Sequence, residues 1–166
     1  ASDAESLARF AAEIFGDTFG HSVAPEELQL FLDRAYGSER QRAEIEDPRM
    51  VTRLVCEDDA IAGFYQLRLP SAIEPQAGDG IKIEIARFYV ERRWHGRGVA
   101  TPMMNAALAE ARQLEGNRVW LTVWEENARA IAFYVKSGFK AEGSTVFLLG
   151  RVQQTDLVMA RGLDAS

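Results

Sequence analysis

The sequence has little of what disulfides and metal sites require, with one cysteine and two histidines among 166 residues. A single cysteine excludes an internal disulfide, because that bond joins two cysteines. Cys56 lies in the apolar run RLVCE, so we expect it to be a small, buried core residue. Neither histidines nor cysteines recur at the spacing of a metal site, which needs several ligands close together. We therefore expect no metal.

Long apolar runs and an excess of basic residues are missing too. No apolar stretch approaches the roughly 20 residues that span a bilayer, and no basic-then-apolar leader opens the chain as a secretory signal would. The 25 acidic residues exceed the 19 basic ones, and the net charge of −6 argues against binding nucleic acid through its phosphates. It permits a cationic small-molecule substrate. Together with the single cysteine, these features predict a cytoplasmic protein with no membrane or nucleic-acid partner.

The length of the chain and its hydrophobic periodicity predict one α/β domain over residues 1–166. The patterns predict helices at 7–19, 24–36, 38–47, 99–116 and 127–138, and strands at 52–57, 61–70, 81–90, 118–124, 144–150 and 155–162. The first two strands form a hairpin around a turn at 58–60, and residues 71–80 form a loop. This order predicts a mixed sheet flanked by helices.

Within this acidic chain, the stretch RRWHGRGVATPM at 92–103 is basic and rich in glycine. It follows a predicted strand and opens a helix, where exposed backbone amides and the helix dipole favour an anion. Gly96 and Gly98 let the backbone approach that anion without a Cβ clash. No Gly-Lys-Ser/Thr follows, which argues against a Walker A loop, and Thr101 replaces the third glycine of a dinucleotide fingerprint. An ordinary strand-to-helix connection with surface arginines remains the alternative.

A second pattern, LTVWEENARAIAFYVKSGF at 121–139, places Asn127 and Tyr134 seven residues apart. Seven residues make nearly two helical turns, so the two side chains share one face. The alternatives are a plain N-cap for Asn127 and a core aromatic with a hydrogen-bonded hydroxyl for Tyr134.

The run RWHGRG fits [RQ]-x-x-G-x-[GA], and about 30 residues later N-x-x-A-x-x-F-Y-x-x-x-G-F follows. In this order and on these elements, the two motifs resemble the GCN5-related N-acetyltransferase (GNAT) superfamily over residues 52–162. The runs DTF, VWEENARAIAFY and QTDLVMA are most similar to bacterial spermine/spermidine N-acetyltransferases. Members of the superfamily usually begin with a strand before the first helix, and here the given sequence opens at the helix, so we expect that strand to be missing.

The resemblance implies that strands 81–90 and 118–124 splay apart around the pantetheine arm of acetyl-CoA. Backbone groups of two strand residues would pair with the arm, the loop amides would hold the pyrophosphate, Asn127 would bond the pantetheine, and Lys136 would reach a phosphate. The implied cofactor-binding residues are Phe88, Val90, Arg93, His95, Gly96, Arg97, Gly98, Val99, Ala100, Thr101, Asn127 and Lys136.

Acetyl transfer to an amine needs a base for the ammonium group and an acid for the departing thiolate. By the resemblance, Tyr134 faces the sulfur as the acid, and Glu84 is the candidate base, acting directly or through water. Strand alternation predicts that residues 84, 86, 88 and 90 share a face. A charge at the cleft edge, or a pair with Arg87, is the alternative for Glu84. Glu125 and Glu126 would attract a polycation or are simply exposed acids.

We therefore expect an acetyl-CoA-dependent N-acetyltransferase that transfers the acetyl group directly, in a ternary complex, to a primary amine such as a polyamine. No cysteine or serine stands in a nucleophile arrangement, which argues against an acetyl-enzyme. The alternatives are a non-catalytic acetyl-CoA sensor and an enzyme acting on protein N-termini or another small amine. A homodimer is compatible with the sequence.

Overall fold

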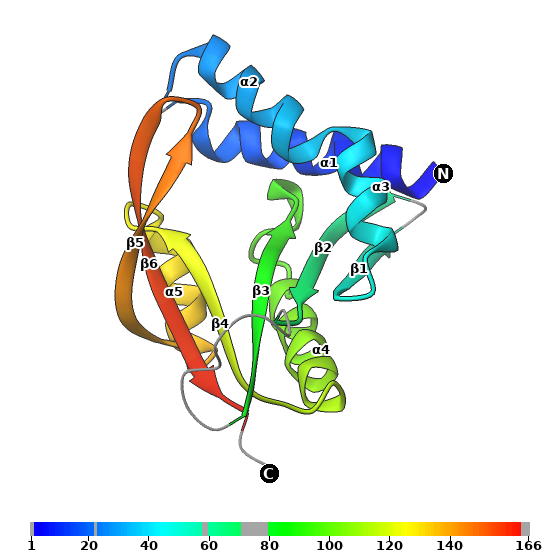
Figure 1. The fold of residues 1–166 in the computed structure, drawn as a ribbon, viewed down its shortest axis with the longest axis vertical. Coiled ribbons are helices and arrows are strands. Elements are labelled where there is room, and N and C mark those ends of the chain that lie inside the picture. Colours follow the sequence, from blue (N-terminus) through cyan, green and yellow to red (C-terminus); the bar gives the residue numbers. More distant parts are fainter. Residues whose placement is uncertain (1, 22, 58–59, 71–79, 164–166) are drawn as a thin grey trace.

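The computed structural model describes residues 2–21, 23–57, 60–70 and 80–163 (Figure 1). The helices are α1 (Ser2–Phe19), α2 (Pro25–Tyr36), α3 (Ser38–Glu46), η1 (Arg92–Trp94, a 3₁₀ turn), α4 (Ala100–Gln113) and α5 (Ala128–Lys136). The strands are β1 (Met50–Glu57), β2 (Ala60–Arg68), β3 (Ile81–Val90), β4 (Gly116–Trp124), β5 (Lys140–Leu149) and β6 (Val152–Gly162). They form one six-stranded sheet in the order β1-β2-β3-β4-β6-β5. The predicted mixed sheet flanked by helices is confirmed.

Each predicted helix and strand is present, with ends that shift by a few residues. Strand β3 has the predicted bounds of 81–90, as its β-branched and aromatic composition favours. The last two strands begin earlier than predicted, because Lys140–Leu149 and Val152–Gly162 pair as one long hairpin. Of the predicted turn at 58–60 and loop at 71–80, residues 58–59 and 71–79 lie outside the described residues.

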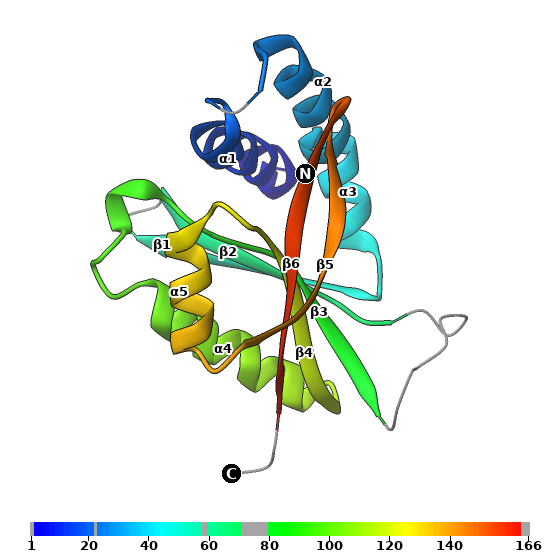
Figure 2. The same cartoon turned by 90° about the vertical axis from the view of Figure 1, so that its left-hand side faces the viewer.

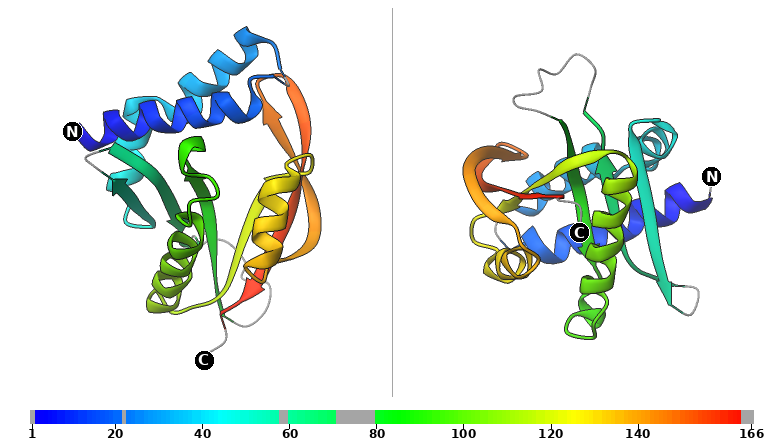
Figure 3. Two further views of the ribbon diagram at one scale, coloured as in Figure 1. Left: turned by 180° about the vertical axis from the view of Figure 1, so that it is seen from behind. Right: turned by 90° about the horizontal axis from the view of Figure 1, so that it is seen from below.

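Strands β3 and β4 pair over only part of their length. Their parallel ladder joins Ile81–Glu84 to Gly116–Trp120, although β3 continues to Val90 and β4 to Trp124. Beyond the ladder β3 stays paired with β2, and β4 stays paired with β6. The two halves of the sheet therefore diverge toward α1 (Figure 1). Seen from behind, α4 and α5 lie on either side of this divergence (Figure 3).

Helices α1 and α2 lie on one face of the sheet and α4 and α5 on the other (Figure 2). An apolar cluster fills the interface on each face. Leu67, Ile83, Leu121 and Met159 pack under α4 and α5, where Met104 and Phe139 are almost fully buried. Phe64 packs under α1 and α2 with Leu7, Phe15 and Tyr36. We call these the α4/α5 face and the α1/α2 face of the sheet, and the space above each face the α4/α5 side and the α1/α2 side. Burial of such side chains is the main force that holds helices onto a sheet.

A β-bulge in β3 overturns the predicted alternation of its side chains. Gln66 pairs with Arg87 and Leu67 with Ile85, so Ala86 is an extra residue with no partner on β2. The alternation changes phase there, and Glu84 shares the α1/α2 face with Arg87 and Tyr89. Phe88 packs on the opposite face. The prediction that residues 84, 86, 88 and 90 share a face is wrong for this reason.

Cys56 is exposed, so the prediction of a buried core residue is also wrong. Strand β1 is the edge strand of the sheet, and most of its side chains after Thr52 are exposed or half-buried. The register of β1 against β2 also shifts between Val55 and Cys56. An apolar run at a sheet edge therefore does not guarantee burial.

Candidate active site between strands β3 and β4

A cavity of about 800 Å³ occupies the opening between β3 and β4. Its lining comes from both faces of the sheet, because the opening passes through it. The α4/α5 side contributes Phe88, Trp94, His95, Gly96, Gly98, Ala100, Thr101, Asn127, Arg129, Ala130, Phe133 and Tyr134. The α1/α2 side contributes Ile14, Phe15, Thr18, Phe19, Phe31, Ala35, Tyr36, Arg68, Glu84, Arg87, Tyr89, Thr122, Trp124, Phe147 and Asp156. One cavity can therefore receive two molecules from opposite sides.

The backbone of β3 points polar groups into this opening. The Glu91 amide donates to the Ala62 carbonyl over 2.9 Å, which fixes the phase of the antiparallel β2–β3 ladder. Backbone groups alternate between the two edges of such a strand, so those of Phe88 and Val90 are directed away from β2 and toward β4. Since the ladder with β4 ends at Glu84, β4 forms no ladder bond with these groups.

The loop between η1 and α4 (residues 95–99), which we call the glycine loop, closes one end of the cavity. Gly96 and Gly98 have φ angles of +74° and +82°, in the left-handed region that favours glycine. No heavy atom lies within 4 Å of a Cβ built on either residue. The loop therefore needs these glycines for its conformation, and the space beside them is open. The adjoining N-terminus of α4 supplies the positive end of a helix dipole.

His95 ties the loop back to β3. Its Nε2 lies 2.7 Å from the Val90 carbonyl oxygen, and its Nδ1 contacts the Arg129 guanidinium. A ring that donates from Nε2 and accepts at Nδ1 is a neutral imidazole. Burial lowers the pKa of His95, the bond to Val90 opposes this, and the positive charges of Arg129 and Arg92 lower it further. These contacts occupy the Val90 carbonyl and leave its amide for a ligand.

Helix α5 presents the second predicted pair. The Asn127 side chain accepts a hydrogen bond from the Ala130 amide over 3.2 Å, so Asn127 is the N-cap of α5. Tyr134 lies seven residues further along the same helix, with its ring against Phe88 and Phe139 at centroid distances of 6.3 and 5.9 Å. Burial raises the pKa of Tyr134, and the nearby Tyr89 raises it further. The hydroxyl is therefore protonated throughout the neutral range.

On the α1/α2 face, the Glu84 carboxylate accepts a hydrogen bond from Arg68 Nη1 over 2.7 Å. Arg68 is thus the partner of Glu84, and the alternative of a pair with Arg87 is wrong. Arg87 instead binds Glu44, on α3, and lies over the Tyr36 ring at 4.9 Å. These contacts hold the α2–α3 corner against β3 beside the cavity.

Three comparisons with known proteins bear on this geometry. A family model described as the acetyltransferase (GNAT) family matches residues 9–139, which is most of the chain. The chain belongs to the GNAT acetyltransferase family. It is therefore an acetyl-CoA-dependent N-acetyltransferase, and acetyl-CoA is its co-substrate.

Of the similar proteins, two match nearly the whole chain and one matches less than half of it. An uncharacterized N-acetyltransferase of Mycobacterium tuberculosis is 35% identical over 97% of this chain and 98% of its own. The crystal structure of the PaiA N-acetyltransferase from Thermoplasma acidophilum, in complex with coenzyme A, has a TM-score of 0.76 and 18% identity over 97% of this chain and 93% of that one. The spermine/spermidine N(1)-acetyltransferase of Bacillus subtilis is 28% identical over only 40% of this chain and 44% of its own.

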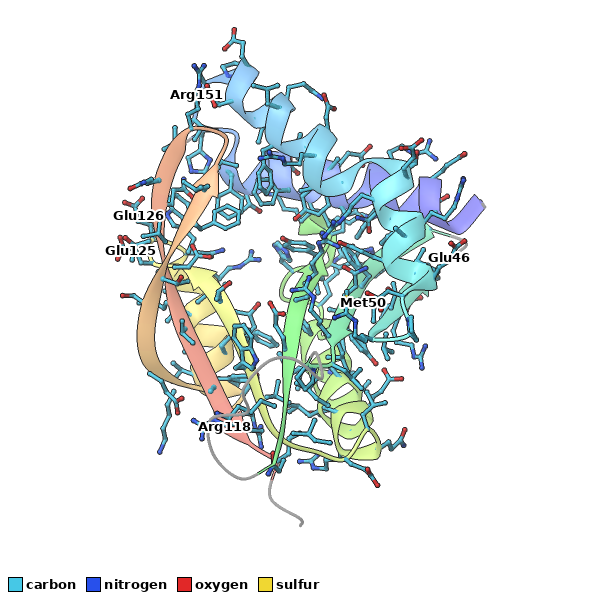
Figure 4. All side chains as sticks on the ribbon, in the orientation of Figure 1. Glu46, Met50, Arg118, Glu125, Glu126 and Arg151 are labelled. Atoms are coloured by element: carbon cyan, nitrogen blue, oxygen red, sulfur yellow. The ribbon has the colours of Figure 1, made fainter. Side chains whose placement is uncertain are left out.

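Most residues that the sequence predicts for the site meet at the cavity of this acetyltransferase. Those in its lining are Glu84, Phe88, Val90, His95, Gly96, Gly98, Ala100, Thr101, Asn127 and Tyr134. Arg93, Arg97, Val99 and Lys136 are not in that lining. Arg93 instead pairs with Glu91 over 2.7 Å, and Lys136 lines a separate hollow of about 330 Å³ beside α4 and α5. Glu125 and Glu126 are exposed in the turn between β4 and α5 (Figure 4).

Several cavity residues have no counterpart in the sequence prediction. The Tyr36 and Tyr89 hydroxyls lie 3.0 Å apart, and each tyrosine comes from a different half of the chain. Asp156 is 7% exposed and lies on β6 opposite Trp124. Their separation along the chain hides them from motif analysis. In Asp156, the only signal in the sequence is a carboxylate inside an apolar strand pattern.

The residues present fit a coenzyme A thioester. The strand-edge groups of β3, the open space at the two loop glycines and the cavity of about 800 Å³ that connects them match an extended arm that ends in phosphates. Trp94 Nε1 adds a buried donor without a hydrogen-bond partner in the described part of the chain. Among the described residues, no cluster of three histidine, cysteine or acidic side chains could hold a metal ion. Likewise, no helix of the described residues is long and apolar enough to span a membrane.

Proposed function

We propose that residues 1–166 act as one domain that binds acetyl-CoA from the α4/α5 side and a primary amine from the α1/α2 side. The observation that carries this proposal is the opening between β3 and β4, which joins the two sides in one cavity. The pantetheine arm pairs with the backbone of Phe88 and Val90 and meets Asn127. Its pyrophosphate lies on the amides of the loop from His95 to Thr101, with Arg93 and Arg97 adding positive charge nearby.

Transfer is direct in this proposal. The acceptor ammonium has a pKa near 10, so it must lose a proton before its nitrogen can attack the thioester carbonyl. The new C–N bond forms as the C–S bond breaks, and the Val90 amide polarises the carbonyl oxygen. Tyr134 gives its proton to the departing thiolate. A protonated, buried phenol suits the role of donor.

Glu84 is the proposed route for the proton that leaves the amine. Its side chain is 19% exposed and lines the cavity on the side from which the acceptor enters. Since Arg68 already binds this carboxylate, we place a water molecule between Glu84 and the amine. Lys136 is a candidate contact for a distal phosphate of coenzyme A, because its hollow also includes Thr101 of the loop.

The acceptor is a primary amine, and polyamines are the first class to test because of the short match to a spermine/spermidine acetyltransferase. The experiment measures thiol release from acetyl-CoA with spermidine, phenethylamine, a peptide N-terminus and an aminoglycoside, and identifies the acetylated product by mass spectrometry. Turnover of one amine, with no acetyl group retained on the protein, supports the proposal. Binding of acetyl-CoA with no thiol release for any amine would favour a sensor.

A Cys56→Ser variant should retain full activity, because Cys56 is exposed on β1, outside the cavity lining.

A further inference from the structure

The α1/α2 side of the cavity contains a carboxylate that the proposed mechanism does not use. Leu157 and Met159 pack in the cluster under α4 and α5. Because side chains alternate along a strand, Asp156 on β6 is directed to the opposite, α1/α2 face. It lines the cavity and is only 7% exposed. Asp156 therefore lies on the side from which the acceptor enters.

Asp156 is less well neutralised than two other buried or half-buried carboxylates, Glu84 in the cavity lining and Glu44 on α3. Its Oδ1 has no hydrogen-bond partner, and it forms no ion pair within the described part of the chain. Glu84 is bound by Arg68, and Glu44 by Arg87 and Arg40. Burial raises the pKa of Asp156, a hydrogen bond from Thr122 lowers it, and the charge of Glu125 raises it. A buried carboxylate of this kind is costly unless a cation or donor meets it.

The walls around Asp156 are aromatic. Trp124 lies opposite Asp156 in the β4–β6 ladder. The centroid of its ring is 5.3 Å from the centroid of the Phe19 ring on α1. Phe31, on α2, stacks on Phe15 and packs edge-to-face with Phe147, at centroid distances of 4.6 and 5.5 Å. All these rings line the cavity. Such a wall favours an apolar, flat ligand and, beside a cation, adds cation–π attraction.

We infer that Asp156 binds the ammonium group of the acceptor, and that the acceptor is a monoamine whose single amino group is joined to an apolar, aromatic body. This inference rests on the proposed function of the cavity. A polyamine would bring several positive charges to a wall that offers one carboxylate without an ion pair among the described residues. An aromatic monoamine brings one positive charge and one apolar surface, which match what the wall offers.

The experiment compares phenethylamine with spermidine as acceptors, and with phenethyl alcohol as a neutral inhibitor of the same shape. We expect kcat/KM for phenethylamine to exceed that for spermidine at least tenfold. In Asp156→Asn, the Michaelis constant for phenethylamine should rise about 10- to 100-fold, the range of a hydrogen bond to a charged group. The Michaelis constant for acetyl-CoA should not change. The inhibition constant for phenethyl alcohol should change little, because this molecule carries no charge.

Glu125→Gln is the matched control, since it removes a nearby exposed charge without touching the cavity lining. Its Michaelis constant for the amine should stay within about threefold of the parent value, as expected of a screened surface charge. Calorimetry with phenethylamine on the protein saturated with coenzyme A gives a readout without turnover. Absence of binding there, a preference for spermidine, or an unchanged Michaelis constant for the amine in Asp156→Asn would overturn the inference. If acetyl-CoA itself fails to bind, the proposed function fails instead.

Discussion

At the scale of single residues, the assignment with the sharpest consequence is Tyr134. Tyr134→Phe removes one hydroxyl and leaves the ring contacts with Phe88 and Phe139 in place. We expect kcat to fall by about 10²–10⁴, the range for a positioned general acid. The affinity for acetyl-CoA should barely change, because the hydroxyl acts mainly in the transition state. Steady-state kinetics and calorimetry measure the two quantities.

Tyr65 provides a matched control for this substitution. It is another buried tyrosine, and its hydroxyl donates to Glu110 over 2.9 Å rather than lining the cavity. Tyr65→Phe should keep kcat within about threefold of the parent value, since it removes only a hydrogen bond outside the site. If Tyr134→Phe instead keeps its kcat while acetyl-CoA affinity collapses, Tyr134 is a binding residue and not the acid.

Glu84 is tested by the pH dependence of its effect. Glu84→Gln keeps the shape of the side chain and removes the base, while Arg68 retains an oxygen to bond. The loss of kcat/KM should be largest at low pH, and it should shrink as pH approaches the ammonium pKa near 10, where free amine is abundant. Rates between about pH 6 and 9.5 give the profile. An equal fractional loss at every pH would mean that Glu84 only orients the substrate.

At the scale of elements, the glycine loop allows a test of the phosphate site. Gly98→Val places a branched side chain at a φ of +82° and in the open space beside the loop. We expect acetyl-CoA affinity to fall at least tenfold, because both the loop conformation and the space are lost. Gly143→Val is the control, since Gly143 lies in β5 at a site with no atom within 4 Å and no positive φ. Similar affinities by calorimetry in both folded variants would contradict the assignment.

The sequence predicted elements better than it predicted the direction of side chains. The composition of 81–90 predicts β3 with its observed bounds, and both loop glycines adopt the left-handed conformation for which glycine is suited. The phase of β3 could not be predicted, because the bulge at Ala86 depends on its pairing with β2. The exposure of Cys56 could not be predicted for a similar reason, because the edge position of β1 is a property of the whole sheet.

The two sides of the candidate site differ in how well the sequence predicts their residues. Its α4/α5 side comes from two contiguous motifs, so the family resemblance that these motifs carry indicates the residues of the loop and α5. Its α1/α2 side is assembled from distant single residues, such as Tyr36 and Tyr89, whose hydroxyls meet only after folding. Asp156 follows this second pattern, because its position in the cavity depends on the pairing of β6 with β4 and β5.

At the scale of the whole molecule, the Glu44–Arg87 pair connects the helical layer to the sheet. The two side chains are only 7% and 12% exposed. Glu44→Gln leaves the Arg87 charge without its partner, so the free energy of unfolding should fall by about 3–5 kcal/mol. Glu142→Gln breaks the exposed pair with Arg118, whose side chains are 45% and 39% exposed, and should cost about 0–1 kcal/mol. Urea denaturation measures both changes, and equal losses would contradict this account.

The same pair predicts part of the acid sensitivity of the fold. Burial raises the pKa of Glu44, but hydrogen bonds and charges from Arg87 and Arg40 outweigh it and hold the pKa below the ordinary 4.5. A depressed pKa contributes stability that is complete above about pH 4.5 and is lost as pH falls further. The unfolding free energy of Glu44→Gln should therefore decline less steeply below pH 4.5 than that of the parent protein. Parallel profiles would show that another carboxylate controls this range.

The most direct test of the central claim is a crystal structure of the protein grown with coenzyme A. The account predicts that the pantetheine arm lies between β3 and β4, bonded to the backbone of Phe88 and Val90. It also predicts the pyrophosphate on the loop around Gly98 and the sulfur within hydrogen-bonding distance of the Tyr134 hydroxyl. Coenzyme A bound outside this opening, for example in the hollow lined by Lys136, or with its sulfur far from Tyr134, would contradict it.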